Sequence, residues 1–107
     1  MRILEFQVKK QRILKKNDCD FTKIVANSVG YLHAKFHFQT DDWSKCDVKV
    51  ASFFNGNQEF AVTLDKNNSC LIPKEVLTEE IFEVSVTGAS KGYSFKTNRT
   101  KVKQEVI

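Results

Sequence analysis

Two histidines, His33 and His37, come nearest to a metal-ligand spacing in this chain. On a helix, side chains four residues apart share one face and could bind the same ion. The surrounding segment Tyr31–Phe38 instead alternates apolar and polar residues, which predicts a strand. On a strand the two imidazoles would be about 13 Å apart, too far to share an ion. We therefore predict no metal site and interpret both histidines as solvent-facing or interface residues.

Two groups of acidic and amide side chains have types suited to binding cations. Asp41 and Asp42 could bind a cation or act as acid and base, but no third ligand or nucleophile is spaced to join them. Asp65, Asn67 and Asn68 resemble part of a calcium loop whose closing glutamate is missing. We interpret the aspartate pair as a loop before a core tryptophan, and the second group as a turn.

The sequence contains no motif that would supply a nucleophile or bind a phosphate. Glycine-rich nucleotide loops, nucleophile elbows and zinc-protease motifs are absent, and the four glycines fall at predicted turns. Cys19, Cys46 and Cys70 are odd in number and lack a CxxC spacing, which argues against a disulfide framework and a zinc site. We expect free thiols that are at least partly buried, with one bridge left open, and we predict no enzyme activity, no cofactor and no small-molecule substrate.

Length and composition predict one domain spanning residues 1–107. The chain is 41% hydrophobic and has nine phenylalanines, enough for one core. No apolar run approaches the roughly 20 residues of a membrane span, and the N-terminus lacks the apolar core of a signal peptide. We expect synthesis in the cytoplasm and no membrane contact. The net charge of +4 permits contact with nucleic acid without requiring it.

Short alternating segments separated by turn residues predict an all-β fold. They are Ile3–Lys9, Ile24–Ala26, Tyr31–Phe38, Asp47–Phe54, Glu59–Leu64, Ser69–Ile72, Ile81–Thr87, Tyr93–Thr97 and Lys101–Val106. The segment Gln11–Leu14 either extends the first strand or starts a second one. Such spacing favours an immunoglobulin-like antiparallel β-sandwich of about seven to nine short strands. A closed barrel shares the same pattern and stays open as an alternative.

The stretch of residues 59–88 reads as the organising unit of this fold. We predict a hairpin in which the turn Asp65–Asn68 returns the chain into Ser69–Ile72. The segment Lys74–Leu77 is long enough for one helical turn. The next strand is expected to end at Gly88, because glycine commonly marks a turn.

The segment Asp47–Phe54 poses a problem of side-chain direction. Val48 and Val50 are expected to face the core. Phe53 and Phe54 are adjacent, so one of them should point outward unless a bulge intervenes. Together with other surface aromatics and late basic residues this gives a set of candidate interface residues. They are Tyr31, Phe53, Tyr93, Arg99, Lys101 and Lys103.

Several pieces of the chain, taken in order, resemble a known module. They are KFHF (35–38), DDW (41–43), NG (55–56), VTLDKNNSCLIPKEVL (62–77), FEVSVTG (82–88) and TNRTKVK (97–103). The ordered set resembles a small sandwich module in virion proteins of tailed bacteriophages of Gram-positive bacteria. It looks like modules that open baseplate upper proteins and occur in head- or tail-fibre proteins. The resemblance covers Tyr31–Lys103 and, more weakly, the first strand.

The resemblance implies a set of fold-defining core residues and no catalytic role for them. They are Trp43, Phe60, Leu64, Ile72, Pro73, Val76, Leu77, Val84 and Val86, joined by Phe36 from the alternation. It implies a virion structural protein of a baseplate, head or tail fibre, or capsid decoration. Its partners would be other virion proteins, with homo-oligomers expected. The chain would be an attachment module cut from a longer protein or a standalone component.

An attachment role would need an exposed sheet face or a free strand edge. The terminal strands Ile3–Lys9 and Lys101–Val106 are our candidates for strand addition. Three other functions stay open. A carbohydrate- or host-surface-binding module would use exposed aromatics, a single-stranded nucleic-acid-binding barrel would add cations to them, and an inhibitor of a host enzyme has no feature that decides it.

Overall fold

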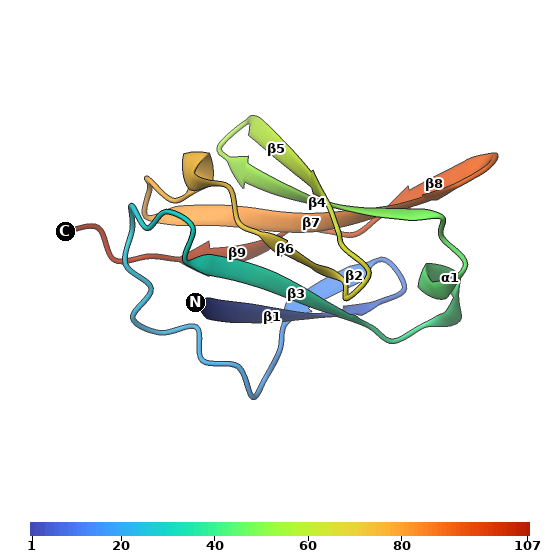
Figure 1. Ribbon diagram of the computed structural model, residues 1–107, viewed down its shortest axis with the longest axis horizontal. Coiled ribbons are helices and arrows are strands. Elements are labelled where there is room, and N and C mark those ends of the chain that lie inside the picture. The colour runs from blue at the N-terminus through green and yellow to red at the C-terminus, as the bar shows by residue number, and fades with distance from the viewer.

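Nine strands in two facing sheets and two single turns of helix make up the chain (Figure 1). The computed structural model describes all residues, 1–107. The elements are β1 (Arg2–Lys9), β2 (Arg12–Lys15), β3 (Leu32–Phe38), α1 (Asp41–Ser44), β4 (Val48–Asn55), β5 (Gln58–Thr63), β6 (Ser69–Leu71), the 3-10 turn η1 (Lys74–Val76), β7 (Ile81–Ser90), β8 (Tyr93–Lys96) and β9 (Thr100–Lys103). The predicted all-β sandwich is confirmed. No helix has the length and apolar character to span a bilayer.

The strand order separates the two sheets and places the first strand in the interior. One sheet has the order β2-β1-β3-β6. The other has the order β5-β4-β7, and β7 then pairs with β8 along its last residues and with β9 along its first. All pairs are antiparallel except β1 with β3. The antiparallel prediction is wrong for that pair, because residues 16–31 return the chain to the end where β1 began.

The core lies between the sheets and is built by the inward residues of alternating strands. Nineteen buried apolar side chains form one cluster. Of the predicted core residues, Phe36, Trp43, Ile72, Val76, Leu77, Val84 and Val86 are buried. Phe60 and Leu64 are half-buried and pack against this cluster, and Pro73 is half-buried. The lower burial of Phe60 follows from its place on an edge strand.

The turn Asp65–Asn68 is present, but the hairpin predicted around it is wrong. Asp65 Oδ1 accepts hydrogen bonds from the backbone N–H groups of Asn67 and Ser69, at 2.8 and 2.9 Å. Asn68 adopts a left-handed φ of +59°. The turn carries the chain from β5 in one sheet to β6 in the other, where β6 pairs with β3. Two alternating segments separated by a turn can cover both faces of one core as readily as they can pair.

The inward face of β4 is the opposite of the predicted one. Ala51 and Phe53 are fully buried, whereas Val48 is 39% exposed. Phe53 is therefore a core residue and not a candidate for surface contact. Phe54 points to the outer side of the five-stranded sheet, yet it is only 7% exposed. The register with β5 is continuous, so the strand has no bulge. Phe54 is buried because other side chains cover it from outside.

Both terminal candidates for strand addition differ from the prediction. β1 lies between β2 and β3, and β2 pairs with its second half, Phe6–Lys9. In the first half, Cys19 and Lys16 of the loop after β2 bond to the backbone of Ile3 and Glu5, so this edge is not free for strand addition. β9 ends at Lys103, after which the Gln104 side chain is buried and donates to the Glu79 carbonyl at 2.8 Å. Val106 is 57% exposed. The predicted strand around Val25 is reduced to a single bridge with Glu105.

A close approach explains why Gly88 lies inside β7 and does not end it. The loop predicted to hold Trp43 contains the short helix α1, which turns the indole into the core. A Cβ atom at position 88 would lie 2.6 Å from Cys46 Sγ and 2.8 Å from Trp43 Cζ3. Only glycine leaves room for these two side chains, as expected where a neighbouring group approaches a strand closely.

Replacing Gly88→Ala should lower the free energy of unfolding by about 1–3 kcal/mol, because the added methyl overpacks the contact with Trp43 and Cys46. Urea unfolding followed by Trp43 fluorescence measures the change. Gly88→Ala should cost less stability in the Cys46→Ala background than in the wild-type chain, because the smaller side chain at position 46 leaves room for the added methyl. An unchanged midpoint for Gly88→Ala would contradict the close approach.

Candidate interaction surface

The predicted interface residues do not converge on one site. Tyr31 precedes β3 at one end of the sandwich, and Tyr93 lies on β8 at the other end (Figure 1). Phe53 is in the core. The remaining three, Arg99, Lys101 and Lys103, lie in or just before β9. Tyr31 and Tyr93 are 48% and 50% exposed, as an interface role requires, but no ligand of ordinary size could touch both.

Tyr93 is the exposed end of a series of aromatic contacts that runs through the core. Its ring lies 6.3 Å from that of Phe95, at an interplanar angle of 12°. Phe95 in turn lies 4.6 Å from Trp43. The series continues on the other side of the indole through Phe38, Phe36, Phe6 and Phe21. Tyr93 thus extends the packing of the five-stranded sheet, and no second exposed aromatic ring faces it.

Arg99 covers Phe54 and is not free for a partner. Its guanidinium lies 3.5 Å from the centre of the Phe54 ring, and its Nη1 lies 3.5 Å from Glu83 Oε1. Lys101 is opposite Glu83 in the register of β9 with β7. A cation over an aromatic face with a carboxylate beside it is a stabilising arrangement. It also explains how Phe54 can face outward and remain buried.

Sequence reasoning missed the outer face of the four-stranded sheet, which gathers exposed apolar residues. We call the outward side of this sheet the outer face. Its residues are Ile3, Glu5, Gln7, Lys9, Arg12, Leu14, His33, Lys35, His37, Ser69 and Leu71, with Tyr31 and Gln39 flanking β3 at either end. Ile3 and Leu71 flank His33 across three neighbouring strands, and we call Tyr31, Ile3 and Leu71 the apolar row. Ile3 and Leu71 are 43% and 45% exposed, and Leu14 farther along is 48% exposed. The alternation in β1 and β3 contained this information, but the partner strand β6 could not be placed without the sheet order.

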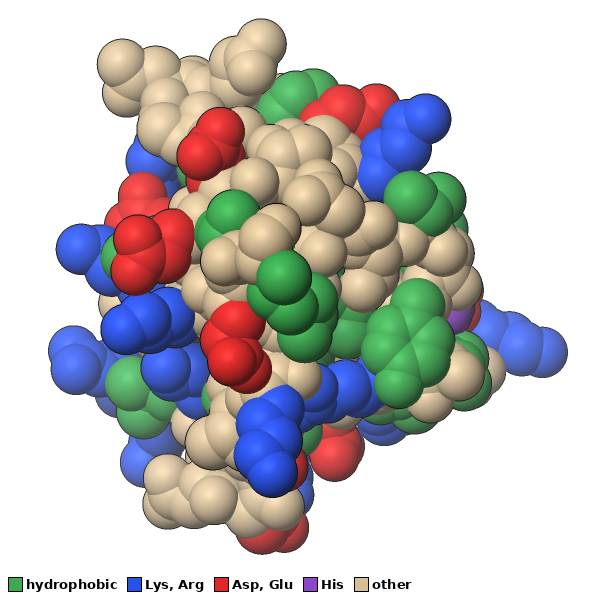
Figure 2. All heavy atoms as spheres, turned by 90° about the vertical axis from the view of Figure 1, so that its left-hand side faces the viewer, with side chains coloured by type: hydrophobic (Ala, Val, Ile, Leu, Met, Phe, Trp, Pro, Cys, Tyr) green, Lys and Arg blue, Asp and Glu red, His purple; other side chains and the backbone are tan.

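At the end of the sandwich where both termini lie, the exposed apolar side chains are scattered. Figure 2 shows hydrophobic side chains there as separate groups among polar and charged ones, with Lys and Arg gathered mainly along one side. Exposed apolar residues at this end include Met1, Tyr31 and Ile107. Singly exposed apolar side chains are ordinary on a protein surface, so an argument for binding needs the aligned row on the outer face.

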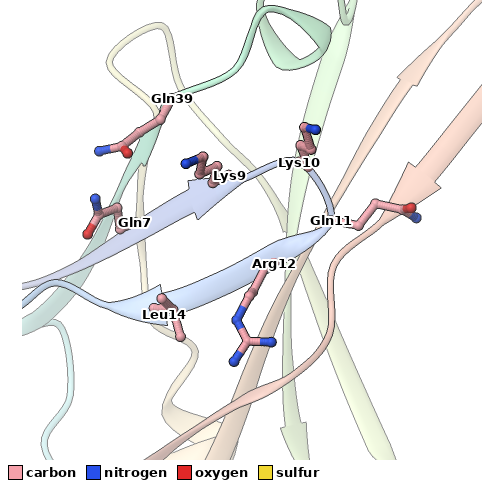
Figure 3. A pocket seen from close by; sticks show the side chains of 7 residues that line it. All are labelled: Gln7, Lys9, Lys10, Gln11, Arg12, Leu14 and Gln39. Atoms are coloured by element: carbon pink, nitrogen blue, oxygen red, sulfur yellow. The ribbon is translucent and has the colours of Figure 1, made fainter.

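The other end of the outer face is basic. Gln7, Lys9, Lys10, Gln11, Arg12, Leu14 and Gln39 line a groove of about 490 Å³ around the β1–β2 turn (Figure 3). The three ion pairs of the chain use Lys16, His37 and Arg99, so none neutralises a cation of this groove. Figure 3 shows Gln11 turned away from the others, and its amide donates to the Lys96 carbonyl at 3.1 Å. The groove therefore offers three unpaired cations beside one leucine.

Between these two ends the outer face is held by polar contacts. His37 Nε2 lies 2.7 Å from Glu5 Oε1. The backbone N–H of Glu5 donates to Cys19 Sγ at 3.3 Å, and the Glu5 carbonyl accepts from the backbone N–H of Lys16. These contacts join the loop after β2 to the part of β1 that β2 leaves unpaired. His33, which stands between Ile3 and Leu71, has its Nδ1 buried without a hydrogen-bond partner.

The thiols are free, as predicted, and burial makes two of them harder to ionise. Burial raises the pKa of Cys70 to about 12 and also raises the pKa of Cys46. A thiol is a nucleophile only as its thiolate, so Cys70 is inert near neutral pH. No three His, Cys, Asp or Glu side chains are grouped to hold a metal ion.

No family model matches the chain, and no curated protein or solved structure matches it. The resemblance to phage virion modules accordingly stays a prediction from the sequence.

Arg99→Ala should lower the free energy of unfolding by about 1 kcal/mol, because it removes the cation from the Phe54 ring and uncovers that side chain. Lys103→Ala, an exposed cation of β9 that stands opposite Ile81 and away from Glu83, serves as the matched control and should change stability by less than about 0.5 kcal/mol. Equal effects of the two substitutions in urea unfolding would show that Arg99 does not cover Phe54.

Proposed function

We propose that this chain is a protein-attachment module of a tailed-phage virion and that the outer face is its binding surface. The observation that carries the attachment role is the pairing on one face of an exposed apolar row with a basic end. The virion assignment rests in addition on the ordered sequence resemblance spanning Tyr31–Lys103. A place in a baseplate, a head or tail fibre, or a capsid decoration is compatible with both.

The residue types on the outer face suit a protein partner. Apolar and aromatic anchors surrounded by polar side chains are the usual anatomy of a protein interface, and Tyr and Arg are common among the residues that contribute most. Tyr31, Ile3 and Leu71 would supply the anchors at one end. Each is about half-exposed, so each has surface left to bury without unfolding anything.

The basic end favours a partner of opposite charge. Lys9, Lys10 and Arg12 have no carboxylate within ion-pair distance in this chain. A partner that covers the whole outer face should therefore carry an acidic patch opposite this groove and an apolar pocket opposite Leu71. Rim charges of this kind act mainly on the association rate, which should fall as salt is added.

The double variant Ile3→Asp/Leu71→Asp should remove the chain from purified phage particles whose genome encodes it, because two charges would replace the apolar anchors. The matched control is Ile81→Asp, since Ile81 is equally exposed at 44% but lies on the five-stranded sheet. Quantitative mass spectrometry of the particles measures incorporation. We expect at least a tenfold loss for the double variant and none for the control.

The basic end has its own pair of variants. Lys9→Glu/Arg12→Glu should weaken incorporation, whereas Lys101→Glu/Lys103→Glu on β9 should not. Carbodiimide cross-linking, which couples a lysine amine to an activated carboxyl group, should join Lys9, Lys10 or Lys35 to an acidic segment of another virion protein in wild-type particles. Absence of the wild-type chain from the particles would overturn the virion assignment, and binding of the isolated chain to glycans or single-stranded nucleic acid would favour the alternatives.

A further inference from the structure

One strand edge of the sandwich lacks every usual protection. β5 (Gln58–Thr63) is the outermost strand of the five-stranded sheet and pairs only with β4. No backbone hydrogen bond joins its six residues to anything on the other side. Figure 1 shows β5 along the outside of the molecule with no element beyond it. An edge of this length presents a row of free N–H and C=O groups to any extended chain.

The other edges are short, covered or charged. Asn98 covers β2, because its side chain accepts from the Ile13 N–H and its own N–H donates to the Gln11 carbonyl. β6 has three residues, and β8 and β9 have four each with lysines among them. Proteins use such devices to prevent unwanted strand pairing. β5 has no lysine, no proline and no bulge.

The single charge in β5 does not guard the edge. Glu59 Oε2 accepts a hydrogen bond from Ser52 Oγ at 2.6 Å, and Ser52 belongs to the neighbouring strand β4. The carboxylate is therefore held back toward the sheet. The inward side chains Phe60 and Val62 are only half-buried, although both pack against the core. A further strand beside β5 would complete their burial.

We propose that β5 pairs antiparallel with β5 of a second copy of this chain, across a two-fold axis at Ala61. Residues that stand opposite in an antiparallel pair share a face of the sheet, so a symmetric pair must be centred on a residue. Centring on Ala61 sets Phe60 opposite Val62 of the partner copy twice, which forms two apolar cross-strand pairs. It sets Glu59 opposite Thr63 and so avoids facing two carboxylates.

This pairing joins two five-stranded sheets into one continuous sheet and leaves the outer face free. The outer face belongs to the four-stranded sheet, so both copies could still bind a partner there. The dimer would therefore present the attachment surface twice. The inference does not depend on the virion assignment, because it concerns the purified chain alone.

Charge substitutions at position 61 test both the edge and its register. Ala61 is exposed on the outer side of β5, so a charged side chain there should not disturb folding. Ala61→Lys and Ala61→Glu should each be monomeric, because like charges would stand directly opposite across the axis. An equimolar mixture of the two should form a heterodimer, whereas the wild-type chain should dimerise alone. Sedimentation equilibrium across a concentration series measures all four samples.

The matched control is Ser94→Lys, which places the same charge on the exposed edge strand β8 and should leave the dimer intact. Hydrogen exchange gives a second readout that needs no variant. About half of the β5 amides point away from β4, and they should become at least tenfold better protected as the wild-type concentration rises. A wild-type chain that stays monomeric at millimolar concentration would overturn the proposal, and so would dimers of both position 61 variants.

Discussion

The hydrogen bond from the Trp43 indole to the Lys10 carbonyl is the contact on which the arrangement of this sandwich most depends. Trp43 Nε1 donates to that carbonyl at 2.8 Å, and the side chain is fully buried. Lys10 has a left-handed φ of +53°, an uncommon conformation for a lysine. Its own N–H donates to Thr40 Oγ1, just before α1. The indole N–H thus ties the β1–β2 turn to the core, and the indole ring packs against Gly88 of the opposite sheet.

This anchor also connects the core to the surface that we propose for binding. Lys9, Lys10 and Arg12 flank or form the turn whose carbonyl Trp43 binds, so the position of the basic groove depends on the indole. A rigid turn would present these cations without a large loss of side-chain and backbone freedom on binding. The β5 edge lies on the other sheet and has no part in this anchor. The two proposed contacts could therefore operate at the same time.

Alternation predicts the strands well, because it reports which side chains face the core. It does not report which strands are neighbours. The inward residues of β1, β3 and β7 follow directly from period two. The prediction for the inward face of β4 is wrong because Arg99, far along the chain, covers Phe54 from outside. Gly88 looked like a strand end because only the folded chain brings Trp43 against it. The apolar row on the outer face needed the pairing of β6 with β3, which local sequence does not encode.

Hydrogen exchange of the Trp43 indole N–H, followed by NMR, tests the central contact most directly. This is the only tryptophan of the chain, so its indole signal is unique. If the indole anchors the turn to the core, its proton should exchange only by global unfolding, with the same free energy as the Phe6 amide in β1. Exchange as fast as that of the exposed Gly56 turn would contradict the account, because the turn and its cations would then move independently of the core.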